Sequence, residues 1–196
     1  MKIFDSGMPE EMYWNSLFDI PLIVGWLNLK SASAPIVEIG CGYGTFTVPV
    51  ALHSKATVHA FDIDPSMIGI AERNVHKADA QNVSFHLLDV VEQGTGLESR
   101  STGMVLLFNI LHFRDRRILL GEASRVLIPH GAVAIIHWRK DIPTPRGPSV
   151  ESPPDKEMIL KSASGLDLYF NGDERILEPY HWGIQLIKTE GSKETE

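Results

Sequence analysis

The sequence has little cysteine and no excess of basic charge. A single thiol, Cys41, occurs in 196 residues, so the chain cannot form an internal disulfide or a cysteine-rich metal site. The 8 histidines lack the i, i+4 spacing of a zinc-binding helix. With 18 Lys and Arg against 25 Asp and Glu, the net charge of -7 disfavours non-specific attraction to nucleic acid. We therefore expect neither a metal nor a nucleic-acid partner.

Long hydrophobic runs are absent as well. No run reaches the about 18 consecutive apolar residues of a membrane span. The first residues, "MKIFDSGMPEEMYW", lack the apolar core of a secretory signal. We expect a cytoplasmic protein with no membrane partner. At 43% hydrophobic residues, 1–196 is long enough for a single domain with its own core.

Strand-like and helix-like segments alternate along the chain. Apolar strands are expected at 36–39, 57–61, 83–88, 104–108 and 132–137, and helices at 44–53, 65–77 and 115–127. This alternation is typical of a doubly wound α/β fold, a mostly parallel sheet with helices on both faces.

The two ends of the chain add to this pattern. Residues 1–30 contain helical segments, one beginning near Pro9, and are expected to form a lid. A helix near 155–162 precedes extended runs at 175–177 and 180–188, which should be antiparallel because the turn between them is short. Residues 189–196 are expected to be a disordered tail.

The stretch "IVEIGCGYGTFTVPVA" places Gly40, Gly42 and Gly44 between the first strand and a helix. Doubly wound sheets bind ligands at this edge, and glycine allows the positive φ of a tight turn there. The dinucleotide fingerprint would place its third glycine at the position of Thr45. The pattern predicts a ligand-binding turn that differs from an NAD site, and the alternative is a tight turn without a ligand.

An acid, Glu38, lies two residues before the first glycine. A carboxylate there would repel a pyrophosphate but would attract a cation. S-adenosylmethionine (SAM) carries an ammonium and a sulfonium, so Glu38 favours SAM over NAD. The alternative for Glu38 is a structural acid that accepts hydrogen bonds from local N–H groups.

Further acids follow the next two strands. Asp62 lies 22 residues after Gly40, where an acid at the tip of the second strand accepts from ribose hydroxyls. Ile63 can pack on a flat base, and Asp64 before a proline is typical of a helix N-cap. Asp89, after the third strand, can accept from the adenine amine, or it is a surface turn acid.

Together these segments resemble the class I SAM-dependent methyltransferases over roughly residues 35–140. The motifs that carry the resemblance are "VEIGCGYG", "FDID", "LLDV", "MVLLFNILHF" and "EASRVLIPHGAVAIIHW". The small-molecule branch called methyltransferase type 11, which includes quinone methyltransferase-like proteins, is the most similar. The resemblance implies strand order 3-2-1-4-5-7-6 with strand 7 antiparallel. It implies these cofactor-binding residues: Glu38, Gly40, Cys41, Gly42, Gly44, Asp62, Ile63, Asp89, Val90 and Asn109. One departure is His130, where many relatives have a turn glycine.

The fourth strand ends in Asn109-Ile110-Leu111-His112, which is not the Asn/Asp-Pro-Pro-aromatic box of amino-group methylases. Cytosine C5 methylases need a nucleophilic cysteine after a proline, and the one thiol of this chain lies in the glycine turn. Cys41 is expected to be a small buried residue beside the cofactor. Methylation of amino groups of this kind and of cytosine C5 is therefore not expected.

Candidates on the acceptor side lie near the ends of the fourth and fifth strands. His112 and His137 are candidate bases, and Arg139 or Arg146 is a candidate anchor for an anionic acceptor. Tyr13 and Trp14 are candidate substrate contacts if the first helix folds over the site. Alternatively, His112 begins a helix, and Tyr13 and Trp14 are packing residues.

Three functions are compatible with this sequence. A small-molecule methyltransferase is favoured. A macromolecule methyltransferase, acting on protein or RNA, is the second. A non-catalytic SAM-binding protein, or an enzyme that transfers another group from a SAM derivative, is the third. A homodimer partner could supply part of the lid.

Overall fold

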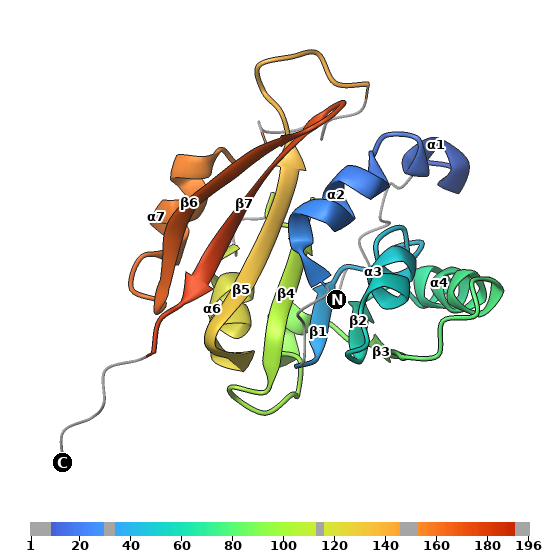
Figure 1. Ribbon diagram of the computed structural model, residues 1–196, viewed down its shortest axis with the longest axis horizontal. Helices are drawn as coiled ribbons and strands as arrows, with labels where there is room; N and C mark the ends of the chain where they lie inside the picture. Colours follow the sequence, from blue (N-terminus) through green and yellow to red (C-terminus); the bar gives the residue numbers. More distant parts are fainter. Residues whose placement is uncertain (1–8, 30–33, 113–115, 146–152, 191–196) are drawn as a thin grey trace.

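The computed structural model describes residues 9–29, 34–112, 116–145 and 153–190, and these form one seven-stranded sheet with helices on both faces (Figure 1). The strands are β1 (Ile36–Ile39), β2 (Val58–Asp62), β3 (Val83–Leu87), β4 (Thr102–Phe108), β5 (Leu127–Trp138), β6 (Leu168–Leu177) and β7 (His181–Lys188). The helices are α1 (Glu11–Asn15), α2 (Ile20–Leu27), α3 (Thr47–His53), α4 (Pro65–Lys77), α5 (Val90–Gln93), α6 (Arg116–Val126) and α7 (Lys156–Ala163).

The sheet order is β3-β2-β1-β4-β5-β7-β6. β1 to β5 pair in parallel, and β7 is antiparallel to both β5 and β6. The predicted fold class and strand order are confirmed. Because β7 is antiparallel, its first residue lies at the same edge as the last residues of β1 to β5.

A hydrophobic core lies on each face because the central strands are apolar at successive positions. On one face, β4 and β5 pack on α5, α6 and α7 through a cluster that includes Leu107, Ile135 and Ile159. On the other face they pack on α2 and α3 through a cluster that includes Phe18 and Ile136.

Local sequence signals and tertiary structure differ at several boundaries. α4 has the predicted bounds, but α3 begins at Thr47 because Gly44 belongs to the turn, with φ 80°. β6 begins at Leu168 and not at residue 175, because a register shift between Phe170 and Glu174 interrupts its pattern. The short helix α5 was not predicted.

β5 begins at Leu127, before the turn-like "IPHG", and so is longer than predicted. His130 within it has φ 65°, a left-handed backbone that glycine adopts without strain. The structure therefore keeps a left-handed residue at the position where the sequence departs from its relatives.

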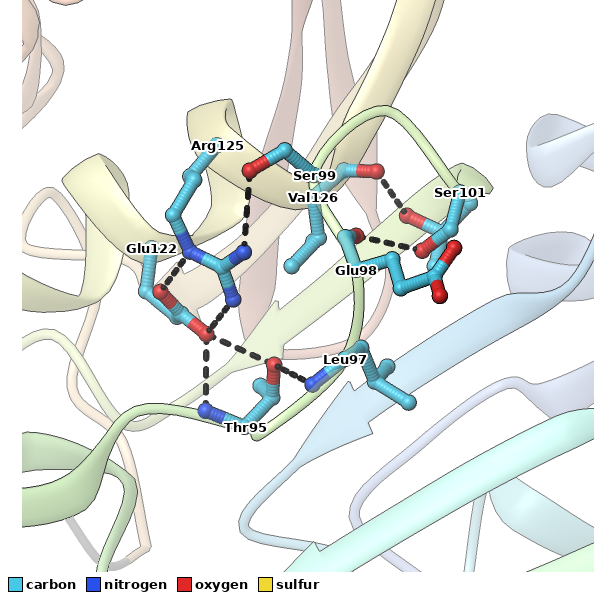
Figure 2. A network of polar contacts seen from close by, with 9 residues as sticks. Thr95, Leu97, Glu98, Ser99, Ser101, Glu122, Arg125 and Val126 are labelled. Carbon is cyan, nitrogen blue, oxygen red and sulfur yellow. Dashed lines mark hydrogen bonds and ion pairs between the residues drawn. The ribbon is translucent and has the colours of Figure 1, made fainter.

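A polar network attaches the loop between α5 and β4 to α6 (Figure 2). The N–H and the hydroxyl of Thr95 both donate to Glu122 Oε1, at 2.7 and 2.6 Å, and Arg125 pairs with the same carboxylate at 2.7 Å. Burial would raise the pKa of Glu122, but these hydrogen bonds outweigh it and lower the pKa to about 2. The network fixes the chain that leads into β4.

None of the described helices is long and apolar enough to cross a membrane.

Candidate active site

The glycine turn connects β1 to α3 with left-handed backbone at Gly40 (φ 79°), Gly42 (φ 52°) and Gly44 (φ 80°). A Cβ on Gly40 would lie 2.7 Å from Ile110 Cδ1, and one on Gly44 would lie 3.2 Å from Ala71 Cβ. The left-handed backbone favours glycine at both positions, and at Gly44 the close approach of Ala71 adds to this preference. The turn lies where the sequence analysis expects a ligand.

Asp62 at the tip of β2 is bonded to this turn. Its Oδ2 accepts from the Gly42 N–H at 2.8 Å, and its Oδ1 accepts from the Asp64 N–H at 3.0 Å. Each oxygen keeps a second lone pair for a ligand hydroxyl. Asp64 caps α4, accepting from the Ser66 N–H at 2.8 Å, so its predicted N-cap role is confirmed. The ribose role of Asp62 stays a prediction.

Glu38 lies beneath the turn and is only 2% exposed. Burial and the charge of Asp62 raise its pKa to about 8, although a hydrogen bond from the Thr47 hydroxyl acts in the opposite direction. Burial, then the charges of Glu38 and Asp62, also raise the pKa of the Cys41 thiol. Two neighbouring carboxyl groups with no basic side chain among these contacts suit a cationic ligand, so the chemistry of the site fits SAM.

Asp89 follows β3 at the same edge of the sheet, beside the tip of β2. Its Oδ1 accepts from the N–H groups of Val91 and Glu92, at 3.0 and 3.3 Å, and so caps α5. The next residue, Val90, is 5% exposed and packs in the core. Asp89 therefore has a structural role. The adenine contact of Asp89 and the cofactor roles of Val90 and of the half-buried Ile63 stay predictions.

Asn109 and His112 follow β4. The Asn109 N–H donates to the Ile136 carbonyl at 2.8 Å, and its backbone is left-handed at φ 55°. His112 Nδ1 lies 3.0 Å from the Asn109 carbonyl, and the His112 and His137 ring centroids are 6.3 Å apart. Burial lowers the pKa of His112. The structure thus brings together Asn109, His112 and His137 from two different strand ends.

The N-terminal helix α1 lies against the glycine turn. Hydrogen bonds join the Tyr43 hydroxyl to the Pro9 carbonyl (2.7 Å), Asn74 Nδ2 to Glu11 Oε1 (2.6 Å) and the Thr45 hydroxyl to Asn15 Oδ1 (2.6 Å). Figure 1 shows α1 at the edge where β5 ends. The lid role of residues 1–30 stays a prediction, and residues 1–8 and 30 of that segment lie outside the described part of the chain.

The predicted acceptor contacts on α1 differ in environment. Tyr13 is 42% exposed. Trp14 packs edge-on against Phe18 and Trp138, with ring centroids 5.0 and 6.3 Å apart. Trp14 therefore joins α1 to the end of β5, and Tyr13 is accessible.

Arg139, the predicted anchor for an anion, already contacts two carboxylates. It pairs with Asp141 at 2.6 Å and with Glu178 at 3.4 Å, and its side chain is 14% exposed. An anionic acceptor would have to displace these partners. The alternative anchor, Arg146, and the tail from residue 191 onward lie outside the described residues.

His181 is a buried residue at this edge that the sequence analysis did not identify. It is 0% exposed and packs between Phe18 and Trp138, with each ring centroid 4.3 Å away. Burial lowers its pKa to about 3. Its environment depends on contacts with Phe18 and Trp138, which are distant in the sequence. Among the described residues, no group of three or more His, Cys, Asp and Glu side chains is arranged to hold a metal.

The chain is similar to known methyltransferases in sequence and in fold. Residues 36–131 match the family described as a methyltransferase domain. A SAM-dependent methyltransferase from Aquifex aeolicus has the same fold, with a TM-score of 0.73 and 21% identity over 87% of this chain and 90% of that one. Magnesium protoporphyrin IX methyltransferase from Synechocystis PCC 6803, solved with bound SAM, gives a TM-score of 0.70 and 15% identity over 96% and 88%. Residues 36–131 are thus similar to a methyltransferase domain, and the chain has the fold of SAM-dependent methyltransferases.

A partial similarity to a curated RNA-modifying enzyme also exists. The 23S rRNA (uracil(1939)-C(5))-methyltransferase of Vesicomyosocius okutanii is 30% identical over 79 residues, which are 40% of this chain. The match spans only 18% of that protein.

Proposed function

We propose that this enzyme transfers the methyl group of SAM to a small molecule by in-line displacement. SAM supplies a methyl group that its sulfonium activates, so the protein has mainly to align the acceptor and exclude water. The proposal is supported above all by the hydrogen bonds that join α1, and Pro9 just before it, to the glycine turn and to α4. With α1 in this place, an acceptor approaches the cofactor between α1 and the ends of β4 and β5, a route that suits a small molecule.

On the cofactor side, the proposed roles follow from chemistry and position. Glu38 and Asp62 provide negative charge for a cationic ligand, and Asp62 also presents lone pairs to the ribose. The glycine turn lets the backbone approach the ligand closely. Asn109 lies between the glycine turn and the end of β5 and would contact both cofactor and acceptor.

Methylation of a uracil C5 in RNA is less compatible with the site. That chemistry proceeds through attack of a cysteine thiolate on the ring. Cys41, the one cysteine of the sequence, is 3% exposed, and burial raises the pKa of its thiol. The net charge of -7 also opposes binding to a polyanion.

The test uses SAM with a labelled methyl group and a cell extract divided into small-molecule, RNA and protein fractions. We expect wild-type protein to label the small-molecule fraction, and Asp62→Ala to lose that label. Glu72→Ala, which removes an exposed carboxylate on α4, is the matched control and should retain it. Label confined to RNA or protein would contradict the proposal.

A further inference from the structure

The apolar row that β4 and β5 present to α6 ends in two polar residues. Its paired members are Val105 with Val133 and Leu107 with Ile135. Two positions further along the chain stand Asn109, which follows β4 with a left-handed backbone, and His137, which lies in β5. The bond from the Asn109 N–H to the Ile136 carbonyl keeps the two strands together to this point. Asn109 and His137 therefore lie near each other at the carboxyl ends of β4 and β5.

The side chains of these two residues have buried polar atoms without a partner in the described part of the chain. They are Asn109 Nδ2 and Oδ1 and His137 Nε2. His137 is 0% exposed. Burial of a polar group without a hydrogen bond is costly, so native structures rarely leave such groups unpaired. Three unpartnered polar atoms at the carboxyl ends of β4 and β5 therefore point to a ligand.

The hydrogen bonding of His137 determines its tautomer. The Trp138 N–H donates to His137 Nδ1 at 3.2 Å, so that nitrogen carries a lone pair. In the neutral ring the proton is then on Nε2, which is the atom without a partner. Nε2 can donate a hydrogen bond, and it cannot accept a proton.

The groups that face His137 are neutral or basic. They are His112 from the loop after β4, Arg116 from α6, Lys140 from the chain after β5 and His181 from β7. Burial in the first place, and these groups in addition, lower the pKa of His137 to about 3, so the ring is neutral at physiological pH. Lys140 pairs with Asp155 at 3.2 Å. A neutral N–H donor near the guanidinium of Arg116 suits an anionic oxygen.

We propose that Asn109 and His137 form an acceptor subsite for an oxyanion, a carboxylate or an ionised acidic hydroxyl, and that His137 donates its Nε2–H to it. The inference rests on the proposed function. The acceptor oxygen forms a bond to the methyl carbon while the carbon–sulfur bond breaks and its electron pair goes to sulfur. The negative charge on oxygen and the positive charge on sulfur disappear together. No proton is removed, so His137 binds the acceptor and is not the base that the sequence analysis considered.

Nuclear magnetic resonance on protein with ¹⁵N-labelled histidine tests the subsite directly. With S-adenosylhomocysteine present, we expect His137 to keep the Nε2–H tautomer from pH 6 to 9. Benzoate, the carboxylate probe, should shift the Nε2–H resonance, whereas the neutral analogue benzamide should not. A ring that titrates near pH ~6.5, an Nδ1–H tautomer or no response to benzoate would overturn the proposal.

Kinetics on the acceptor found with the labelled extract provide a second test. His137→Phe removes the donor and should lower kcat/KM roughly 10- to 100-fold, mainly through KM, because a hydrogen bond to a charged group is lost. His137→Gln keeps a donor and should retain most activity. His76→Gln, at an exposed position on α4, is the control.

The alternative role gives a different result. If His137 were a general base, the acid limb of the kcat/KM profile would vanish in His137→Gln, and the subsite proposal would be wrong. A neutral acceptor would also overturn it. Absence of any label transfer would instead refute the proposed function, and the resonance experiment would still test the subsite because it needs no turnover.

Discussion

The backbone N–H of Gly42 donates a hydrogen bond of 2.8 Å to Oδ2 of Asp62. This contact joins the turn after β1 to the tip of β2. A single carboxylate therefore holds together two neighbouring segments at the carboxyl ends of the strands. Its other oxygen accepts from the Asp64 N–H at the start of α4. Asp62 thus holds the turn in place and presents its remaining lone pairs at the edge.

Replacing Asp62 should therefore affect both binding and folding. Asp62→Ala should weaken SAM binding by about 1.5–3 kcal/mol, the scale for hydrogen bonds to a charged group, and should lower stability through the loss of the Gly42 contact. Calorimetry and thermal unfolding measure the two effects, with Glu72→Ala as the control. Unchanged SAM affinity in Asp62→Ala would disprove the ribose role.

The buried Glu38 predicts a pH dependence of SAM binding. Because its pKa is about 8, the carboxyl group of Glu38 is largely protonated at pH 7 when no cofactor is bound. A cationic ligand favours the ionised carboxylate. Affinity for SAM should rise with pH up to about 8 and then level off, with proton release on binding. Glu38→Gln should remove this dependence, and Glu72→Gln should retain it. Calorimetry across pH is the measurement, and a flat wild-type profile would contradict the prediction.

Glu38 should also make the free energy of unfolding depend on pH, but in the opposite direction to SAM binding. The carboxyl of Glu38 has a folded-state pKa of about 8 against an ordinary value of 4.5. Between these values the folded state binds more protons than the unfolded state, so the free energy of unfolding should fall as pH rises from 4.5 to 8. Denaturation of the cofactor-free protein, with Glu38→Gln for comparison, checks the direction. Equal slopes in the two proteins would remove Glu38 as the cause.

The network at Glu122 should stabilise the fold without affecting the cofactor. Glu122→Ala removes hydrogen bonds from Thr95 and Arg125, and we expect a loss of about 2–4 kcal/mol with SAM affinity nearly unchanged. Because the folded-state pKa of about 2 lies below the ordinary 4.5, this stabilisation is present above pH 4.5 and is lost as pH falls towards 2. Denaturant unfolding of Glu122→Ala beside the surface control Glu157→Ala is the test, and equal stabilities would contradict it.

The contacts of α1 should govern release of the cofactor. Tyr43→Phe loses the bond to the Pro9 carbonyl, and we expect SAM to dissociate roughly 2- to 10-fold faster, the scale for one neutral hydrogen bond. Tyr169→Phe, at a residue 48% exposed, is the matched control. Stopped-flow dissociation measures the rates. If Tyr43→Phe releases SAM at the wild-type rate, α1 is not a lid.

Features that depend on near neighbours in the chain could be predicted from the sequence. The bounds of α4, the N-cap at Asp64 and the turn at Gly40 to Gly44 follow from local residue types. The environment of His181 could not be predicted, because it depends on contacts with Phe18 and Trp138, which are distant in the sequence. The contact of Arg139 with Glu178, which is 39 residues away, was likewise not predicted. The cytoplasmic location and the homodimer stay predictions.

The most direct measurement of the central claim is mass spectrometry of a small-molecule extract incubated with the protein and SAM that carries a trideuterated methyl group. The account predicts a low-molecular-weight product that is heavier than its precursor by one trideuteromethyl group in place of a hydrogen. This product should form with wild-type protein and Glu72→Ala but not with Asp62→Ala. Deuterium found only in RNA or protein, or in no product at all, would contradict the account.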